Sequence, residues 1–322
     1  MRFRSLGDSG LMVSVAGLGC NNFGRRVDLA GTRAVVDAAI DAGITMLDTS
    51  DTYGDGGASE ELLGEVLAGR REQVVLATKF GHSAYDMGYG PAAGAKGGRS
   101  YIRRAVEASL RRLRTDYIDL YQLHTPDPVT PVAETLAALT ELVTEGKVRY
   151  VGHSNFTGWQ IADAAHVARA TGTAPFVSAP FVSAQNHWSL LERGTEAEVV
   201  PAARHFGLGV LPYFPLANGL LTGKVRRGQA PPAGSRLAGR LGYVTDDKLD
   251  RVEALIAWAA ERGRTVLEVA IGALAAKDGC SCVIAGATTP EQVKANAAAA
   301  EWIPTAENLA DLDRVVPPPS RR

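Results

Sequence analysis

Eight short runs of apolar and β-branched residues alternate along this chain with segments whose apolar residues recur every three or four positions. The expected strands are Val13–Gly19, Ile44–Asp48, Val74–Lys79, Tyr117–His124, Val148–Ser154, Phe176–Asn186, Gly209–Pro215 and Cys282–Ala287. The expected helices are Leu29–Ala42, Ser59–Ala68, Ser100–Leu113, Pro131–Glu145, Thr157–Thr171, Glu198–Phe206, Asp247–Lys277 and Pro290–Ala300. Because the strands are continuously apolar, helices must cover the outside of a parallel sheet. The alternation predicts a (β/α)8 barrel, with residues 1–322 forming one domain.

Capping residues support this alternation. Thr130 followed by Pro131 predicts a helix N-cap with proline in the first turn, and Thr265 with Glu268 predicts a capping box. A helix often ends at a glycine with positive φ, and such glycines precede several expected strands: Gly43, Gly146, Gly172, Gly207 and Gly279.

The first residues predict a separate element. In Phe3–Val15, the turn Gly7-Asp8-Ser9-Gly10 separates two short β-prone stretches, which indicates a hairpin that plugs the barrel bottom. An open, doubly wound sheet would need three glycines after its first strand. The run Gly17-Leu18-Gly19-Cys20-Asn21-Asn22 lacks the third, so the barrel is favoured.

Composition excludes several function classes. The 34 Lys and Arg residues nearly balance 35 Asp and Glu, so no basic field for nucleic acid or anionic membranes is expected. No apolar stretch reaches the roughly 18 residues of a membrane span. Three cysteines make no disulfide framework and favour a reducing, cytoplasmic location. The absence of H-E-x-x-H and of clustered histidines argues against a metal site.

Ionisable residues end three successive expected strands, where the active residues of such barrels lie. They are Asp48 in ITMLDTSDTYG, Lys79 in VVLATK and His124 in YIDLYQLH, with Tyr53 one turn beyond the first. A single ionisable residue would be ordinary at the solvent-facing mouth of a barrel. Three on successive strands, with a tyrosine close by, indicate a functional site. Further polar or aromatic residues occupy the later strand ends: Ser154, Asn155, Gln185 and Tyr213.

The chemistry of these residues is mutually consistent. A tyrosine hydroxyl titrates near ~10 and is a sluggish acid unless a cation favours its phenolate. Lys79 can supply that cation, Asp48 can hold the lysine, and His124 can hydrogen-bond the carbonyl oxygen that Tyr53 protonates. Such a group can protonate the oxyanion that forms when a hydride attacks a carbonyl carbon. It contains no good nucleophile for acyl transfer.

The sequence resembles the aldo-keto reductases over nearly its whole length. The resemblance lies in LDTSDTYGDGGASEELLG, LATKFG, EASLRRLRTDYIDLYQLH, GKVRYVGHSNF, SAQNHWSLL, LPYFPLANGLLTGK and IAGATTPEQVKAN. It implies a catalytic tetrad of Asp48, Tyr53, Lys79 and His124, with Tyr53 as general acid. It also implies reduction of a small aldehyde or ketone by NADP(H) bound in an extended form across the barrel mouth.

The same resemblance implies which residues bind the cofactor. Ser154, Asn155 and Gln185 match the positions that hold the nicotinamide carboxamide, and Tyr213 matches the ring that stacks on the nicotinamide. The full expected set is Gly19, Cys20, Asn21, Asp48, Ser154, Asn155, Gln185, Tyr213, Phe214, Pro215, Leu216, Ala217, Gly219, Lys224, Arg236, Gly286, Thr288, Gln292 and Asn296. Phe214 replaces a common serine, and Ala295 replaces a glutamate that often contacts the adenine.

Two alternatives to a reductase remain. A non-catalytic nucleotide-sensing subunit would keep the fold, but all four tetrad residues are present. A metal-dependent isomerase would need clustered Glu, Asp and His ligands that the strand ends do not offer. Specificity is expected from the loops Gly81–Arg99 and Ala217–Asp247 and from the tail after Trp302. The sequence assigns no particular carbonyl compound and no oligomeric state.

Overall fold

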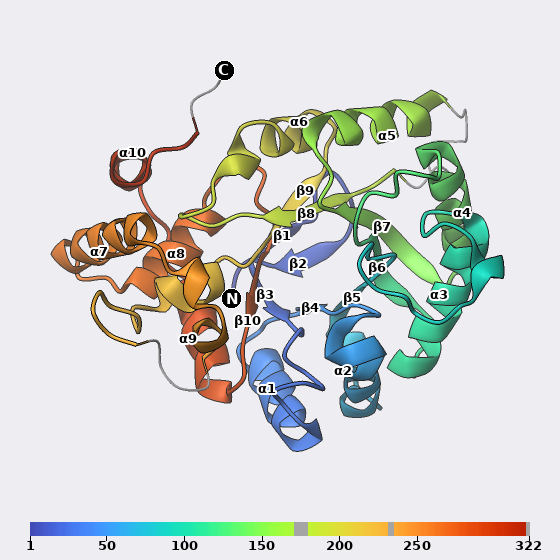
Figure 1. Ribbon diagram of the computed structural model, residues 1–322, viewed down its shortest axis with the longest axis horizontal. Helices are drawn as coiled ribbons and strands as arrows, with labels where there is room; N and C mark the ends of the chain where they lie inside the picture. The colour runs from blue at the N-terminus through green and yellow to red at the C-terminus, as the bar shows by residue number, and fades with distance from the viewer. Residues whose placement is uncertain (171–179, 231–234, 320–322) are drawn as a thin grey trace.

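The computed structural model describes residues 1–170, 180–230 and 235–319. Eight parallel strands in this part of the chain close into a barrel, in which β10 pairs with both β3 and β9 (Figure 1). The strands are β3 (Ala16–Gly19), β4 (Met46–Asp48), β5 (Val75–Phe80), β6 (Ile118–Leu123), β7 (Val148–Ser154), β8 (Ser183–His187), β9 (Gly209–Tyr213) and β10 (Val283–Gly286). The predicted (β/α)8 barrel is confirmed.

Helices surround this barrel (Figure 1). Most follow a strand in the predicted alternation, and α10 was not predicted. The described helices are α1 (Leu29–Asp41), α2 (Tyr53–Val66), α3 (Arg99–Leu113), α4 (Val132–Thr144), α5 (Gly158–Ala170), α6 (Val199–His205), α7 (Asp246–Glu261), α8 (Val266–Ala275), α9 (Pro290–Ala299) and α10 (Ala306–Val315). Buried apolar residues between helices and strands form the main core.

The predicted hairpin closes the amino end of the barrel. Strands β1 (Phe3–Ser5) and β2 (Met12–Ser14) pair antiparallel. Gly7 at their turn has φ +58°, and a Cβ there would collide with the Gly207 carbonyl oxygen. The hairpin's apolar side chains pack on inward-facing residues of the barrel in one cluster: Leu6, Leu11, Val13, Met46, Ala77, Leu120, Leu211, Cys282 and Ile284.

Some expected boundaries were wrong. The expected helix Asp247–Lys277 is two helices, because Gly263 adopts φ +63° between them and the predicted capping box of Thr265 and Glu268 starts α8. The expected strand Phe176–Asn186 begins only at Ser183 within the described residues.

Two further local expectations differ in outcome. Thr130 donates a hydrogen bond to Asp127 Oδ2 at 2.8 Å and does not cap α4, which has Pro131 at its N-cap position. The positive φ expected at the helix-ending glycines is confirmed at Gly43, Gly146, Gly207 and Gly279, whereas Gly172 lies outside the described residues.

Candidate active site

Lys79 is the centre of a buried polar group at the carboxyl end of the barrel. Its ammonium donates hydrogen bonds to Asp48 Oδ2 at 2.6 Å, to the Thr49 carbonyl oxygen at 2.9 Å and to Tyr53 Oη at 3.3 Å. Lys79 is 1% exposed and Asp48 2% exposed. The structure therefore brings three of the four predicted tetrad residues into direct contact.

The local sequence after β4 explains how Tyr53 reaches this group. Tyr53 begins α2, but the next four residues, Gly54–Gly57, all have positive φ. At Gly54 a Cβ would lie 2.8 Å from the Phe23 carbonyl oxygen, so the tight turn there requires glycine. This irregular turn holds the phenol over the strand ends before the regular helix starts.

Burial and charge act in opposite directions on these groups. Burial raises the pKa of Tyr53 above its ordinary value, although the nearby Lys79 ammonium partly counteracts the shift. Burial also disfavours the lysine charge, but Asp48 and Tyr53 outweigh it and the pKa of Lys79 is raised. Tyr53 is therefore a protonated donor beside a permanent cation near neutral pH.

His124 directly follows β6 and completes the predicted tetrad. Its ring lies edge-on to the Tyr53 ring, with centroids 5.9 Å apart, and its Nδ1 lies 3.1 Å from Ser50 Oγ. Burial, Lys79 and His82 together hold the pKa of His124 well below its usual range. The imidazole is therefore neutral at physiological pH.

Asp48 is held by two amides besides the lysine. Its Oδ1 accepts hydrogen bonds from Gln185 Nε2 at 2.9 Å and from Gln122 Nε2 at 3.3 Å. Gln122 was not predicted. The period of two in a strand could have found it, because Gln122 stands two residues before His124 and so lies on the same face of the extended chain.

Ser154, Asn155 and Tyr213 form a hydrogen-bonded network beside the tetrad. Tyr213 Oη donates to Asn155 Oδ1 at 2.8 Å, and Asn155 Nδ2 donates to the His124 carbonyl oxygen at 2.9 Å. Ser154 Oγ donates to the Gln185 carbonyl oxygen at 2.8 Å. Asn155 adopts φ +64°, which an asparagine tolerates better than most residues. The four residues expected to meet the nicotinamide thus lie together.

The Tyr213 ring already has a neighbour on one side. His187 lies nearly parallel to it, with an interplanar angle of 9° and centroids 5.4 Å apart.

The segment after β9 has an unusual backbone. Phe214, Ala217 and Asn218 have φ between +47° and +59°, and Gly219 has φ +109°. Pro215 and Leu216 lie between the first two, and the Leu216 carbonyl oxygen accepts bonds from the Gly219 and Leu221 N–H groups. Several left-handed residues in one segment store strain of the kind found at ligand-binding loops.

Arginines gather where this segment meets the loop after β3. Arg236 donates to Asn21 Oδ1 at 3.0 Å and to Asn22 Oδ1 at 3.1 Å, and lies over the Phe214 ring. Burial lowers the pKa of Arg236, and three further guanidinium groups add to this: Arg240, Arg26 and Arg25. Like charges drawn together in this way favour an anion. Lys224 is exposed on the same segment.

The residues expected at the adenosine end lie at β10 and the start of α9. Gly286 ends β10 and pairs in register with Gly19. Thr289 is the N-cap of α9, and Gln292 Oε1 accepts a hydrogen bond from the Thr288 N–H at 2.9 Å.

Two other predicted cofactor residues are buried. Asn296 is 6% exposed and Cys20 is fully buried.

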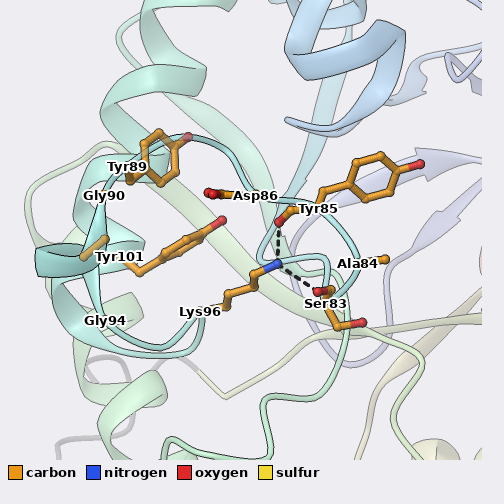
Figure 2. Close-up of a pocket in the computed structure, with 10 residues that line it drawn as sticks. Ser83, Ala84, Tyr85, Asp86, Tyr89, Gly90, Gly94, Lys96 and Tyr101 are labelled. Carbon is orange, nitrogen blue, oxygen red and sulfur yellow. Dashed lines mark hydrogen bonds between the residues drawn. The ribbon is translucent and has the colours of Figure 1, made fainter.

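The loop between β5 and α3 borders the tetrad through His82, whose ring lies edge-on to His124 at 4.5 Å. Lys96 ties this loop together by donating to the carbonyl oxygens of Ser83 and Tyr85 (Figure 2). The loop and the start of α3 form an open pocket of about 340 Å³, whose lining includes Tyr85, Tyr89 and Tyr101.

With this geometry in view, the comparisons with known proteins identify the family. The model named "Aldo/keto reductase family" matches residues 16–317. The chain belongs to the aldo/keto reductase family.

Three relatives that match nearly the whole chain carry two kinds of name. An uncharacterized oxidoreductase, YrpG, from Bacillus subtilis (strain 168) is 38% identical over 99% of this chain and 97% of its own length. Probable voltage-gated potassium channel subunits beta from Oryza sativa subsp. japonica and Arabidopsis thaliana are 35% and 33% identical, over 98% of this chain and 97% and 95% of their lengths.

Two searches of the described residues gave negative results. None of the helices within them is long and apolar enough to cross a membrane. The same part of the chain contains no group of three or more His, Cys, Asp or Glu side chains placed to hold a metal ion.

Proposed function

We propose that this oxidoreductase reduces a small aldehyde or ketone with NADPH and that Tyr53 is the general acid. The observation that carries the proposal is the placement of one ammonium, Lys79 Nζ, between Asp48 Oδ2 and Tyr53 Oη. The four side chains include no good nucleophile for acyl transfer. The reduction of a carbonyl group needs a proton donor of this kind, because it leaves an oxyanion that must take up a proton.

The chain's own residues have separate tasks in this reaction. Asp48 stabilises the charged form of the buried Lys79 side chain. The amides of Gln185 and Gln122 donate to Asp48 Oδ1 and fix the orientation of the carboxylate. Lys79 stabilises the Tyr53 phenolate that remains after proton transfer. His124 and Tyr53 converge on the carbonyl oxygen and hold it in place.

NADPH, when bound, supplies the hydride. Three features fit such a cofactor. The arginines around Arg236 match its phosphates, and the segment Phe214–Gly219 leaves open space next to Gly219, since a Cβ there would meet its nearest atom only at 4.0 Å. The Tyr213 ring, which already lies parallel to the His187 ring, is of a kind on which a nicotinamide would stack.

We assign the remaining contacts to the residues that the family resemblance implies. Asn155, Ser154 and Gln185 would hold the carboxamide, and the start of α9 would meet the 2′-phosphate. Thr288 and Gln292 carry hydrogen-bond donors there, and this favours NADP(H) over NAD(H).

A second candidate function is that of a nucleotide-sensing channel subunit. The specific observation for it is the name of two relatives that match nearly the whole chain. In that function the cofactor would bind tightly without turnover.

One experiment separates the two candidates. Purified full-length protein is titrated with NADPH, and the loss of NADPH absorbance is then followed with an activated aromatic aldehyde. Turnover that depends on the aldehyde supports the reductase. Tight NADPH binding with no turnover across a panel of aldehydes and ketones contradicts it and supports the sensor.

A further inference from the structure

A hydrogen-bonded chain leads from His124 to a buried carboxyl group. Ser50 Oγ lies 3.1 Å from His124 Nδ1 and donates to Asp51 Oδ1 at 3.2 Å. Ser50 and Asp51 are both fully buried. The proposed reaction uses neither residue, yet a buried carboxyl group is connected to the catalytic imidazole through a single hydroxyl.

The hydrogen bonding of the Asp51 carboxyl is incomplete. Its Oδ1 has the Ser50 hydroxyl as donor, whereas its Oδ2 is buried and has no hydrogen-bond partner among the described residues. A buried carboxylate needs donors, and a bond to a charged acceptor is stronger than one to a neutral acceptor. The ionised form of Asp51 therefore draws the Ser50 proton toward itself.

The donor count at Ser50 then favours one tautomer of His124. A hydroxyl has one proton and two lone pairs. One lone pair accepts from the Thr52 N–H at 3.3 Å. When the Ser50 proton goes to ionised Asp51, the second lone pair can accept from His124 Nδ1–H, and this favours the tautomer with its proton on Nδ1. The Thr52 hydroxyl is the other neighbour of Ser50 Oγ, at 3.1 Å, and either hydroxyl can donate in that pair; as an acceptor, Thr52 Oγ1 is neutral and weaker than a carboxylate.

Protonation of Asp51 reverses this order. The carboxyl O–H then donates to Ser50 Oγ, and the Ser50 hydroxyl donates to His124 Nδ1. A neutral imidazole that accepts at Nδ1 carries its proton on Nε2. Since Nε2 makes no hydrogen bond within the described part of the chain, this is the nitrogen that a substrate would meet.

We propose that the Asp51 carboxyl, acting through the Ser50 hydroxyl, selects the tautomer that His124 presents to the carbonyl substrate. The proposal rests on the reductase function proposed above. In the change from ionised to neutral Asp51, a solvent proton bonds to Nε2, Nδ1 passes its proton to Ser50 Oγ, and Ser50 passes its own to Asp51 Oδ1. The chain gains one proton and no electrons move. Asp51 is thus a positioning residue.

The groups around Asp51 place this change in the physiological range. Burial and the Glu60 charge on α2 raise the pKa of Asp51 to about 7. The Ser50 hydrogen bond and the charges of Arg112 on α3 and Lys79 on β5 lower it and only partly offset this rise. Three tyrosines also face the carboxyl group and feel its charge: Tyr89, Tyr101 and Tyr121. The imidazole does not titrate in this range, because the pKa values of both His124 and His82 are lowered.

Nitrogen NMR of the imidazoles tests the proposal without any need for activity. The full chain carries 15N-labelled histidine, and His124→Gln identifies the signals of this residue among the six histidines. Roughly one pH unit below 7, we expect the His124 proton mainly on Nε2, and roughly one unit above 7 mainly on Nδ1. At each of these pH values the major tautomer should exceed the minor one about tenfold. A single tautomer across this range overturns the proposal.

Three variants sharpen the test. Asp51→Asn and Ser50→Ala should both abolish the pH dependence of the tautomer. Glu60→Gln should move the midpoint to lower pH, because it removes a like charge next to Asp51. The matched control Asp127→Asn removes a carboxylate that bonds Gly97, Val129 and Thr130 instead, and should leave the midpoint unchanged. A tautomer change that persists in Asp51→Asn overturns the proposal.

The kinetic readout is the pH profile of carbonyl reduction. With Nε2–H available below the midpoint, kcat/KM should be roughly tenfold or more higher than above it, and this step should be absent in Asp51→Asn. If the NMR change is present but no carbonyl compound is turned over, the proposed function fails and the proton chain stands. If turnover is present and the tautomer never changes, the proton chain fails alone.

Discussion

The two ends of the barrel are formed by the same strands but bury different kinds of side chain. At the amino end, Leu6 and Val13 of the hairpin pack on inward-facing apolar residues such as Leu120. At the carboxyl end, an ion pair between Lys79 and Asp48 is buried. Apolar contacts stabilise the first end, whereas charges removed from water occupy the second.

This difference indicates how stability and chemistry are divided in the molecule. Burial of a charge and left-handed backbone such as that of Phe214 both cost free energy. Those costs are concentrated at the mouth, and the closely packed bottom offsets them. Changes at the mouth should therefore alter turnover most, and changes at the bottom should alter stability alone.

The largest effect is expected for Lys79→Met. The variant should lower kcat roughly 10²–10⁴-fold, as loss of acid catalysis does. It should also lower the free energy of unfolding by about 3–5 kcal/mol, because it leaves the Asp48 charge buried and unpaired. Steady-state kinetics and denaturant unfolding measure the two effects.

The double variant Asp48→Asn/Lys79→Met is the control for misfolding. It removes both charges, so the free energy of unfolding should return toward that of the wild type while turnover stays low. Recovery of turnover in the double variant would contradict the role assigned to the lysine.

Leu6→Ala tests the other end of the barrel. Leu6 is fully buried in the cluster under the hairpin, and its truncation should lower the free energy of unfolding by about 2–5 kcal/mol. The values of kcat and of the NADPH Kd, measured well below the melting temperature, should match the wild type. A large loss of kcat would show that the two ends are coupled.

Asp51→Asn tests the cost of a buried charge through the pH dependence of stability. The pKa of Asp51 is about 7 in the folded protein, above the ordinary value of about 3.9. The folded state therefore binds more protons between these values, and wild-type stability falls as the pH rises from about 4 to 7. The variant should be more stable than the wild type by a few kcal/mol above pH ~7, with no advantage near pH ~4. Thermal melts across this range measure the difference, and parallel curves for the two proteins would contradict it.

The smallest effect is expected for Gln292→Arg at the start of α9. An arginine there can form a charge-assisted bond to a 2′-phosphate, so the ratio of kcat/KM for NADPH to that for NADH should rise several-fold. The helix start should weaken by about 1 kcal/mol, because Gln292 Oε1 no longer accepts from Thr288. If the ratio of kcat/KM for NADPH to that for NADH falls instead, the 2′-phosphate does not bind at the start of α9.

The sequence predicted the barrel well because its signal is repetitive. Each strand–helix unit carries its own hydrophobic period, so local errors such as the late start of β8 do not alter the topology. The ends of the strands were predicted for the same reason, and with them the contact of Asp48, Lys79 and Tyr53.

Contacts that depend on side-chain direction were not predicted. Gln122 bonds Asp48 across two strands, and Ser50 bonds the buried Asp51 carboxyl, although both lie within motifs that the sequence analysis singled out. Their roles follow from three-dimensional register and burial, which neither spacing nor composition reports. The helix α10 was missed because it lies beyond the strand–helix repeat.

Tyr53→Phe gives the most direct test of the central claim, that the phenol held by Lys79 protonates the substrate. The change removes one oxygen and leaves Asp48 and Lys79 paired. We expect kcat for aldehyde reduction to fall roughly 10²–10⁴-fold while the Kd for NADPH, measured by fluorescence titration of the same sample, stays within about twofold. Near-wild-type turnover with NADPH bound would contradict the account.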